Sequence, residues 1–319
     1  MAKVLVTGGA GFIGSHLVDR YIKEGWDVVI VDNLSTGKRE QINPRAKFYQ
    51  MSVLDRKIKD IFKKEKFDLV NHHAAQINVR FSVEKPQIDV KENILGTLNL
   101  LDACQTSGVK NFIFISSGGA IYGEPKSLPV KETYPKAPLS PYGIDKLAIE
   151  FYLFFYKKFF EINYVCLRYA NVYGPRQDPS GEAGVIAIFS QKMLKGEVPT
   201  IFGDGEQTRD YVFVEDVVEI NILVSSMVEN LNHREIISID DLAYNVGTGI
   251  EESVNNLYSK LSTLTGFKKP PFHGQLKKGE VRKICLDPAK AERELIWKPT
   301  TSLEQGLKKT VEWTRHSLK

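Results

Sequence analysis

The amino-acid sequence predicts an α/β fold, a doubly wound parallel sheet followed by a smaller C-terminal α/β lobe, and three observations support this prediction. Strand-like and helix-like segments alternate from the N-terminus to about residue 175. A glycine-rich turn joins the first strand to the first helix. Beyond residue 175 the elements become shorter and less regular. Alternation indicates a parallel sheet, because neighbouring parallel strands need a crossover connection between them.

Apolar runs predict the strands of this sheet at 3–7, 28–31, 48–49, 67–71, 111–117 and from residue 164 onward. Helical patterns lie between them, through about residue 24, from about residue 55, near 87–107 and over 141–160. With 319 residues and 42% hydrophobic side chains, the chain is long enough to bury a substantial core.

The glycine-rich turn has the pattern of a dinucleotide site. Gly8, Gly11 and Gly14 follow the first strand and lead into a helix. Glycines at this spacing let the main chain turn tightly, approach a pyrophosphate and pack the helix on its strand, while the helix N-terminus attracts phosphate. We therefore expect a Rossmann sheet in a dinucleotide-binding domain over 1–175 and a substrate lobe over 176–319, with the chain crossing between the lobes.

Asp32 ends the second predicted strand, eighteen residues after Gly14. An acid near this place accepts hydrogen bonds from the adenosine ribose hydroxyls and repels a 2′-phosphate. Lys38 and Arg39 point the other way, because a basic residue in this loop could bind a 2′-phosphate. We infer NAD rather than NADP and interpret the two basic residues as solvated loop charges.

A Tyr and Lys pair stands at the start of a later helix. Pro141 suits the first helical turn, so Tyr142 and Lys146, four residues apart, share one helix face. A fixed ammonium nearby favours the phenolate and is expected to lower the pKa of Tyr142 from its usual value of about 10, which would make it a proton acceptor. Ser117 ends the strand 111–117 and is expected near Tyr142, because ligands of such sheets bind at the carboxyl ends of the strands.

Charge and composition exclude several classes of function. The chain carries 43 Lys and Arg against 39 Asp and Glu, and it has no basic run of the length that binds nucleic acid. We find no signal peptide before the first strand and no apolar run of membrane-spanning length, so we expect a cytoplasmic protein without a membrane partner. Three separated cysteines indicate reduced, buried thiols, and the six histidines show no metal-ligand spacing, so no metal is expected.

The glycine turn, Asp32-Asn33, Tyr142-x-x-x-Lys146 and the segment 168–171 together resemble the extended short-chain dehydrogenase/reductases, and most closely the UDP-sugar 4-epimerases. The resemblance covers essentially the whole chain. It implies reversible C4 epimerisation of UDP-glucose and UDP-galactose through a 4-keto intermediate with tightly bound NAD. Tyr142 would act as base and then as acid, and Lys146 would hold the nicotinamide ribose. The family also forms an intersubunit four-helix bundle, which implies a homodimer built on the aromatic helix 151–160 and the helix 87–107.

The resemblance assigns binding residues along the chain. The residues expected to contact NAD are Gly8, Gly11, Phe12, Ile13, Gly14, Asp32, Asn33, Ser35, Thr36, Gly37, Ala74, Ala75, Asn93, Ser116, Tyr142, Lys146 and Tyr169. The residues expected to contact the UDP-sugar are Ser117, Gly118, Gly119, Asn171, Val185, Thr200, Phe202, Arg209, Lys277, Arg282 and Ile284. The expected catalytic residues are Tyr142, Lys146 and Ser117.

Three positions depart from the pattern of that family. Its helper hydroxyl falls at Gly118 here, and Ser117 is the nearest substitute. Lys277 stands where an arginine often binds the diphosphate, so it offers one charged donor group and not the two parallel donors of a guanidinium. Ser52 replaces an acid that is common near the adenine.

Other functions stay open at this stage. A UDP-N-acetylglucosamine or UDP-glucuronate 4-epimerase would use the same machinery. Ile284, of intermediate size at the expected border of the sugar's C2 substituent, favours UDP-glucose and UDP-galactose with some activity on UDP-N-acetylglucosamine. A nucleotide-sugar dehydratase needs an acid and a base that Gly118 and Gly119 do not supply. A non-catalytic NAD-sensing regulator would have no need of Tyr142 and Lys146.

Overall fold

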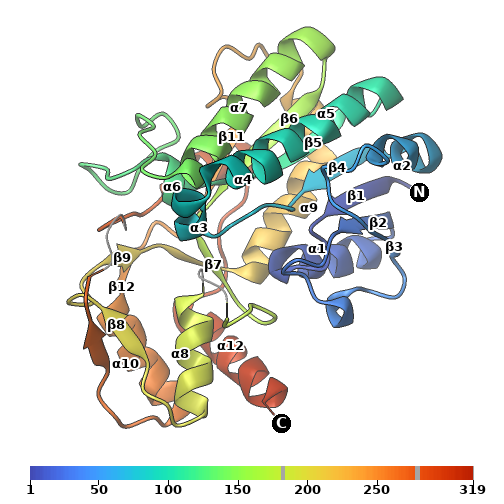
Figure 1. The fold of residues 1–319 in the computed structure, drawn as a ribbon. Coiled ribbons are helices and arrows are strands. Elements are labelled where there is room, and N and C mark those ends of the chain that lie inside the picture. The colour runs from blue at the N-terminus through green and yellow to red at the C-terminus, as the bar shows by residue number, and fades with distance from the viewer. Residues whose placement is uncertain (181–183, 277–280, 319) are drawn as a thin grey trace.

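The computed structural model describes residues 1–180, 184–276 and 281–318, and it contains the predicted parallel sheet. Seven strands pair in the order β11-β6-β5-β4-β1-β2-β3 (Figure 1). Every pairing in this sheet is parallel. The strands are β1 Lys3–Thr7, β2 Asp27–Asp32, β3 Lys47–Gln50, β4 Leu69–His72, β5 Asn111–Ser117, β6 Asn163–Tyr169 and β11 Ala243–Val246. The strand order reverses direction between β1 and β4, which is where a doubly wound sheet opens a crevice for ligands.

Helices cover both faces of the sheet, as the alternation of side chains along the strands requires. In β1, Val4 and Val6 belong to one core and Leu5 to the other. The first core includes side chains of α1 Phe12–Lys23, α9 Val214–Leu231 and α11 Ala289–Leu295. The second includes those of α2 Ile58–Glu65, α5 Gly96–Ser107 and α7 Pro141–Phe160. The Rossmann-type fold class predicted from the sequence is confirmed.

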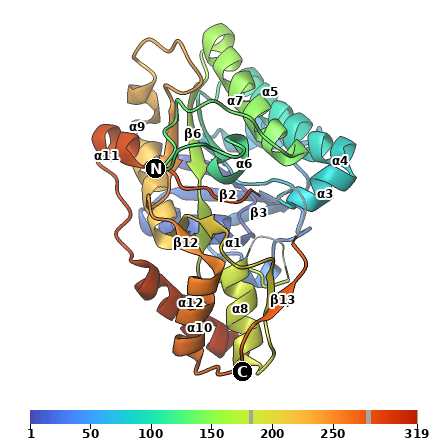
Figure 2. The same cartoon turned by 90° about the vertical axis from the view of Figure 1, so that its left-hand side faces the viewer.

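A smaller lobe lies beside the carboxyl ends of the strands (Figures 1 and 2). Its core joins the helices α8 Val185–Leu194, α10 Val254–Thr265 and α12 Leu303–Ser317. Three short strand pairs accompany them, namely β7 Asn171–Tyr173 with β10 Tyr211–Phe213, β8 Thr200–Phe202 with β13 Phe272–Gly274, and β9 Thr208–Arg209 with β12 Glu252–Ser253. The chain returns to the large sheet in α9 and β11, beyond residue 175. The division into domains at residue 175 stays a prediction.

The expected single helix over 87–107 is wrong in detail. The chain forms α4 Pro86–Val90, then a π-helical turn, η2 Lys91–Leu95, and then α5. Three short helices were not predicted: η1 Arg39–Gln41, α3 Val79–Glu84 and α6 Gly118–Ile121. A side-chain cap begins α3, since Asn78 Oδ1 accepts a hydrogen bond from Phe81 N at 2.6 Å.

Within the described ranges, the helices are all too short or too polar to cross a membrane.

A buried ion pair fixes α7 against the sheet. Arg168 of β6 is 0% exposed, and its Nη2 donates to Glu150 Oε2 of α7 at 2.5 Å. The same nitrogen donates to Asp240 Oδ1 at 2.8 Å. Ser116 of β5 donates its hydroxyl to Glu150 Oε1, also at 2.5 Å. Residues from β5, β6 and the segment before β11 therefore meet α7 in one polar cluster.

Replacing Arg168 by Met should lower the free energy of unfolding by about 3–5 kcal/mol, because the Glu150 carboxylate would stay buried without its cation. Urea unfolding followed by circular dichroism measures this change. Arg293→Met is the matched control, since Arg293 pairs with Glu294 at 2.8 Å while its side chain is 67% exposed. Removing such a surface pair should cost less than about 1 kcal/mol. Equal losses in the two variants would contradict the role of the buried pair.

Candidate active site

The glycine turn at the end of β1 is tightly built. Gly8 has φ +69°, and a Cβ placed there would lie 2.7 Å from Ala74 N. Gly11 N donates to Gly8 O at 3.0 Å, and a Cβ on Gly14 would collide with that same carbonyl. Phe12 and Ile13 are the first residues of α1, so free N–H groups at the helix start face the turn. This arrangement brings bare main chain and a helix N-terminus to the sheet edge, as a pyrophosphate requires.

Asp32 holds the next part of the site together. Its Oδ2 accepts from Ala10 N at 3.0 Å and its Oδ1 from Leu34 N at 2.8 Å. A carboxylate offers about four lone-pair sites, so acceptor capacity remains for ribose hydroxyls. Gly37 lets this loop lie close to the carboxylate, because a Cβ at that position would lie only 2.9 Å from Asp32 Oδ1. The remaining predicted residues of this loop are exposed or half-buried: Asn33, Ser35 and Thr36.

The basic residue Arg39 has partners on β3. Its Nη2 donates to Gln50 Oε1 at 2.6 Å and its guanidinium lies 5.8 Å from the Phe48 ring. These contacts support the interpretation of Arg39 as a surface residue rather than a 2′-phosphate ligand.

Residues predicted for the middle of the cofactor meet after β4. Ala74 N donates to Thr7 Oγ1 at 3.1 Å. Ala75 follows, and Gln76 N then donates to Asn93 Oδ1 at 2.8 Å. Asn93 Nδ2 returns a bond to Gln76 O at 3.1 Å. Asn93 therefore fixes the loop that contains Ala74 and Ala75, next to the glycine turn.

The residues after β5 divide into two groups. The hydroxyls of Ser116 and Tyr169 have protein partners, since Ser116 donates to Glu150 and Tyr169 accepts from Asn221 Nδ2 at 2.5 Å. A Cβ on Gly119 would make only ordinary contacts, at 3.9 Å from both Ser117 Oγ and Asn171 Oδ1. Ser117, Gly119 and Asn171 therefore lie close together, and their role in a substrate pocket stays a prediction.

Gly118 has a structural reason to lack a side chain. A Cβ added to Gly118 would collide with Leu286 Cδ1 and lie 3.2 Å from the Arg168 carbonyl. The space of the family's usual helper hydroxyl is therefore filled by Leu286. The Ser117 hydroxyl instead acts on the Tyr142 side chain, where it opposes the rise of the phenol's pKa.

Tyr142 and Lys146 begin α7 and lie close together. Ser140 caps the helix by accepting from Gly143 N at 3.2 Å, and Tyr142 N donates to Ser82 Oγ of α3 at 3.2 Å. Lys146 Nζ lies 5.8 Å from the centre of the Tyr142 ring and donates to the Ile115 carbonyl at 2.8 Å. The two side chains therefore share one helix face at the end of β5, as the spacing predicts.

Burial moves both pKa values away from the ordinary range. It lowers the pKa of Lys146 to about 8, opposed by the negative charges of Asp89, Asp145 and Glu150. It raises the pKa of Tyr142 to about 12, opposed by the Ser117 hydroxyl. The expected lowering of the Tyr142 pKa is thus wrong for the polypeptide by itself. Desolvation of the phenolate outweighs the ammonium, which is turned to the Ile115 carbonyl.

Two arginines predicted for the diphosphate lie on neighbouring segments of the smaller lobe. Thr208 N donates to Arg282 O at 3.1 Å, and Arg209 Nη1 reaches the same carbonyl at 3.4 Å. The Arg282 guanidinium forms a bidentate pair with Asp204, with both N–O distances at 2.8 Å. Lys277 lies outside the described residues.

The other predicted substrate residues take different places. Val185 begins α8, and Thr200 and Phe202 are the ends of β8. Ile284 is only 2% exposed and belongs to a small apolar cluster with Tyr122 and Leu286. Its assignment beside the C2 substituent of the sugar stays a prediction.

Sequence reasoning missed several residues that build this site. Ser82 belongs to a helix that was not predicted, and Leu286 and Asp204 act through contacts between distant segments. The glycine pair 118–119 was the available signal for Leu286, because consecutive glycines after a strand often mark close approach of another chain segment.

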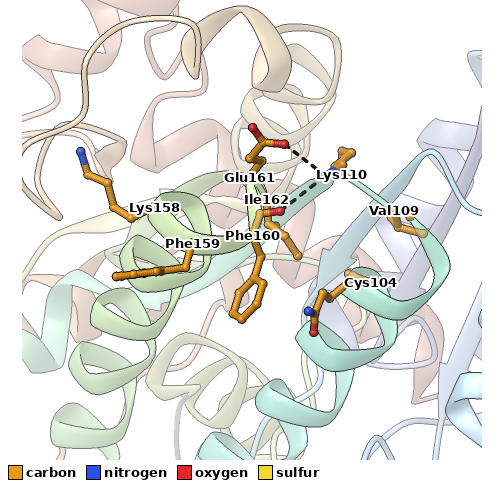
Figure 3. Close-up of a pocket in the computed structure, with 10 residues that line it drawn as sticks. Cys104, Val109, Lys110, Lys158, Phe159, Phe160, Glu161 and Ile162 are labelled. Atoms are coloured by element: carbon orange, nitrogen blue, oxygen red, sulfur yellow. Dashed lines mark hydrogen bonds and ion pairs between the residues drawn. The ribbon is translucent and has the colours of Figure 1, made fainter.

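Figure 3 shows a depression at the opposite edge of the sheet, between the ends of α5 and α7. Lys110 Nζ there approaches the Phe160 carbonyl at 3.4 Å and Glu161 Oε2 at 3.8 Å. None of the predicted site residues that the structure describes lines this depression, so we place the active site at the carboxyl ends of the strands.

Residues 4–247 match the profile of the NAD dependent epimerase/dehydratase family. The chain belongs to this family. It is 49% identical to a UDP-glucose 4-epimerase from Thermotoga maritima solved with UDP-glucose, with a TM-score of 0.94 and coverage of 99% of this chain and 100% of that one. The Thermus thermophilus UDP-glucose 4-epimerase solved with NAD is 39% identical, with a TM-score of 0.89 and coverage of 98% and 99%. The UDP-glucose 4-epimerase of Mycolicibacterium smegmatis is 39% identical over 98% of this chain and 99% of its own.

The cofactor of the family is NAD, and the site described above fits it. A Cβ at Gly8 or Gly14 would fill the cradle at the glycine turn, and Asp32 keeps acceptor capacity for ribose hydroxyls. Gly8, Gly11, Gly14 and Asp32 would hold the adenosine half. Lys146 of α7, which donates to the Ile115 carbonyl of β5, would contact the nicotinamide half.

Gly118→Ser should lower the free energy of unfolding by about 1–3 kcal/mol, because the new side chain and Leu286 need the same space. The double variant Gly118→Ser/Leu286→Ala should lose less free energy of unfolding than the sum of the losses in Gly118→Ser and Leu286→Ala. Gly119→Ala is the control, since its Cβ finds only ordinary contacts at 3.9 Å. Urea unfolding of the parent protein, the two single variants and the double variant measures the coupling, and strict additivity would contradict the shared space.

Proposed function

We propose that this protein catalyses the reversible C4 epimerisation of a UDP-hexose, with UDP-glucose and UDP-galactose as its main substrates. The observation that carries the proposal is the grouping of Ser117, Tyr142 and Lys146 at the end of β5, on the sheet edge that also bears the glycine turn. Membership of the NAD dependent epimerase/dehydratase family supports the same reaction class.

Each polar group has a separate task in this proposal. Tyr142 accepts the proton of the C4 hydroxyl and later returns it. When bound, NAD supplies the acceptor and donor for the C4 hydride. Ser117 acts on the Tyr142 side chain, and Lys146 contributes a positive charge 5.8 Å from the ring, so both stabilise the phenolate. The 4-keto sugar turns about its diphosphate, and the hydride then returns to its opposite face.

The smaller lobe holds the nucleotide part of the substrate. Arg209 and Arg282 bind the diphosphate, with Asn171, Val185, Thr200 and Phe202 around the rest of the UDP-sugar. Gly119, beside Ser117 and Asn171, has no side chain of its own to hinder the turning of the keto sugar. Dehydration is disfavoured, because Gly118 and Gly119 offer no acid or base and Leu286 occupies the space beside Gly118.

Tyr142→Phe should reduce kcat by about 10²–10⁴-fold, because the proton acceptor is removed while the fold remains. The assay incubates the protein with UDP-galactose and no added NAD, then separates the sugars. Tyr152→Phe is the control, since Tyr152 lies on the same helix with its side chain partly exposed. Dinucleotide released on denaturation should be equal in all three proteins. Turnover of Tyr142→Phe near that of the control would reject Tyr142 as the base.

We infer that the protein is a cytoplasmic homodimer. Its three cysteines are free and buried, which suits a reducing compartment. Several large apolar side chains of α7 are exposed and follow a helical stripe, from Ile144 through Phe151 and Phe155 to Phe159. Ile88, Val90 and Leu95 are also exposed on the adjacent segment of α4 and η2, which lies beside α7 in Figure 1. A contiguous apolar surface of this kind supports association of two copies.

Phe151→Glu should convert a dimer to a monomer, because two copies of the new charge would be buried near the two-fold axis of the proposed interface. Sedimentation velocity at micromolar concentration measures the change. Ile250→Glu is the control, since Ile250 is 67% exposed but lies between β11 and β12. A monomeric parent protein would reject the proposed dimer.

A further inference from the structure

Two carboxyl groups meet between α4 and α7, next to the catalytic lysine. Asp89 is 0% exposed and Asp145 is 2% exposed, and they lie on two helices, α4 and α7, that pack against each other. Asp89 Oδ1 accepts from Gln76 Nε2 at 2.6 Å and from Asn93 Nδ2 at 3.2 Å. The other oxygen of each carboxyl, Oδ2, is buried and faces no N–H or O–H donor among the described residues.

Such a pair must hold a proton. Two ionised carboxylates in contact repel each other strongly, and burial removes the water that would screen them. One shared proton supplies the missing donor and leaves a single negative charge on the pair. Burial and the neighbouring Asp89 raise the pKa of Asp145 to about 7, in agreement with this geometry. The proton belongs to the pair rather than to one residue.

Lys146 follows Asp145 on α7, and the charge of the pair acts on it. The titratable groups that face Lys146 are Asp89 of α4, Tyr142, Asp145 and Glu150 of α7, His72 and His73 at the end of β4, and Cys166 of β6. Burial lowers the pKa of His73 to about 3 and raises that of Cys166, so both are neutral at pH 7. Burial likewise keeps His72 and Tyr142 uncharged at that pH.

Glu150 is the remaining anion, and it is already neutralised. Its carboxylate is held by Arg168 through three hydrogen bonds. Among the groups that the structure describes around Lys146, the Asp89–Asp145 pair is therefore the negative charge that has no other cation to balance it.

We propose that Asp89 and Asp145 are a positioning pair, which shares one proton and holds one negative charge beside Lys146 so that the buried ammonium stays protonated during catalysis. The inference rests on the proposed function, in which Lys146 acts as a cation. The pair also holds Gln76 and Asn93, which fix the loop after β4, so the same two carboxyls join the cofactor loop to the catalytic helix.

The direct test measures the pKa of Lys146 by NMR on holoenzyme labelled with 13C at lysine Cε, the resonance being the one that disappears in Lys146→Met. At an effective dielectric constant of about 20, a unit charge about 6 Å from any titratable group shifts the pKa of that group by roughly 2 units. The double variant Asp89→Asn/Asp145→Asn removes the charge of the pair and should lower the Lys146 pKa by about 1–2 units. Asp145→Asn, which keeps one negative charge on Asp89, should leave the Lys146 pKa nearly unchanged.

The kinetic test measures kcat/KM for UDP-galactose against pH and follows its fall at high pH, the basic limb of the profile. The active form needs protonated Lys146, so a lower Lys146 pKa moves the loss of activity to lower pH. The limb should move by about 1–2 pH units in the double variant, and should stay nearly unchanged in Asp145→Asn. Glu84→Gln, which removes one exposed charge from α3, is the matched control and should leave the limb in place.

The two tests separate the possible failures. An unchanged Lys146 pKa in a double variant that still melts cooperatively would overturn the role of the pair, whatever the substrate. A shifted Lys146 pKa in a protein that epimerises no UDP-sugar would support the pair and reject the proposed function. Should the double variant fail to fold, 13C NMR of the aspartate Cγ resonances in the parent protein decides, since two carboxyls of the pair that both ionise with ordinary pKa values would overturn the shared proton.

Discussion

The position of α7 depends on the buried contact between Arg168 and Glu150. The guanidinium comes from β6 and the carboxylate from the middle of α7, while Ser116 ties the same carboxylate to β5. A buried ion pair contributes little net stability compared with well-packed apolar side chains, but it tolerates only one arrangement of its partners. Its value here is geometric, because the helix that it fixes begins with Tyr142 and carries Lys146 one turn before Glu150. Loosening this contact would release the proton acceptor and the cation together.

With α7 fixed, desolvation becomes the main electrostatic influence on the site. It acts in opposite directions on the two catalytic groups, since it raises the pKa of Tyr142 to about 12 and lowers that of Lys146 to about 8. At neutral pH the phenol is therefore protonated and the ammonium still charged. The polypeptide supplies one cation and one hydroxyl donor near the phenol, and the oxidised nicotinamide ring of NAD carries a further positive charge. In the proposed reaction, bound NAD would therefore add to the positive charge that favours the phenolate of Tyr142.

The sequence predicted the parts of the fold that depend on local pattern. The strand over 3–7 and the glycine-rich turn that follows it are visible without a structure, and both are found as expected. The four-residue separation of Tyr142 and Lys146 likewise needs only helix geometry. What could not be predicted depends on contacts between distant segments. Leu286 fills the space beside Gly118 from the far end of the chain, and Ser116 turns to Glu150 because α7 brings a carboxylate to it.

The substrate lobe shows how such a long-range contact can prepare a binding group. Arg282 was expected to be available for a diphosphate, yet its guanidinium already binds Asp204 through two bonds of 2.8 Å. The geometry of a carboxylate bound by a guanidinium fork is close to that of a phosphate bound in the same way. A diphosphate that replaces Asp204 therefore exchanges one charge-assisted contact for another, while Arg282 is already ordered. The Asp204 contact would limit the conformational entropy that Arg282 loses when a diphosphate binds. It would also lower the net free energy gained on binding, because the contact with Asp204 must be broken. The lobe would then orient its nucleotide and still release the product.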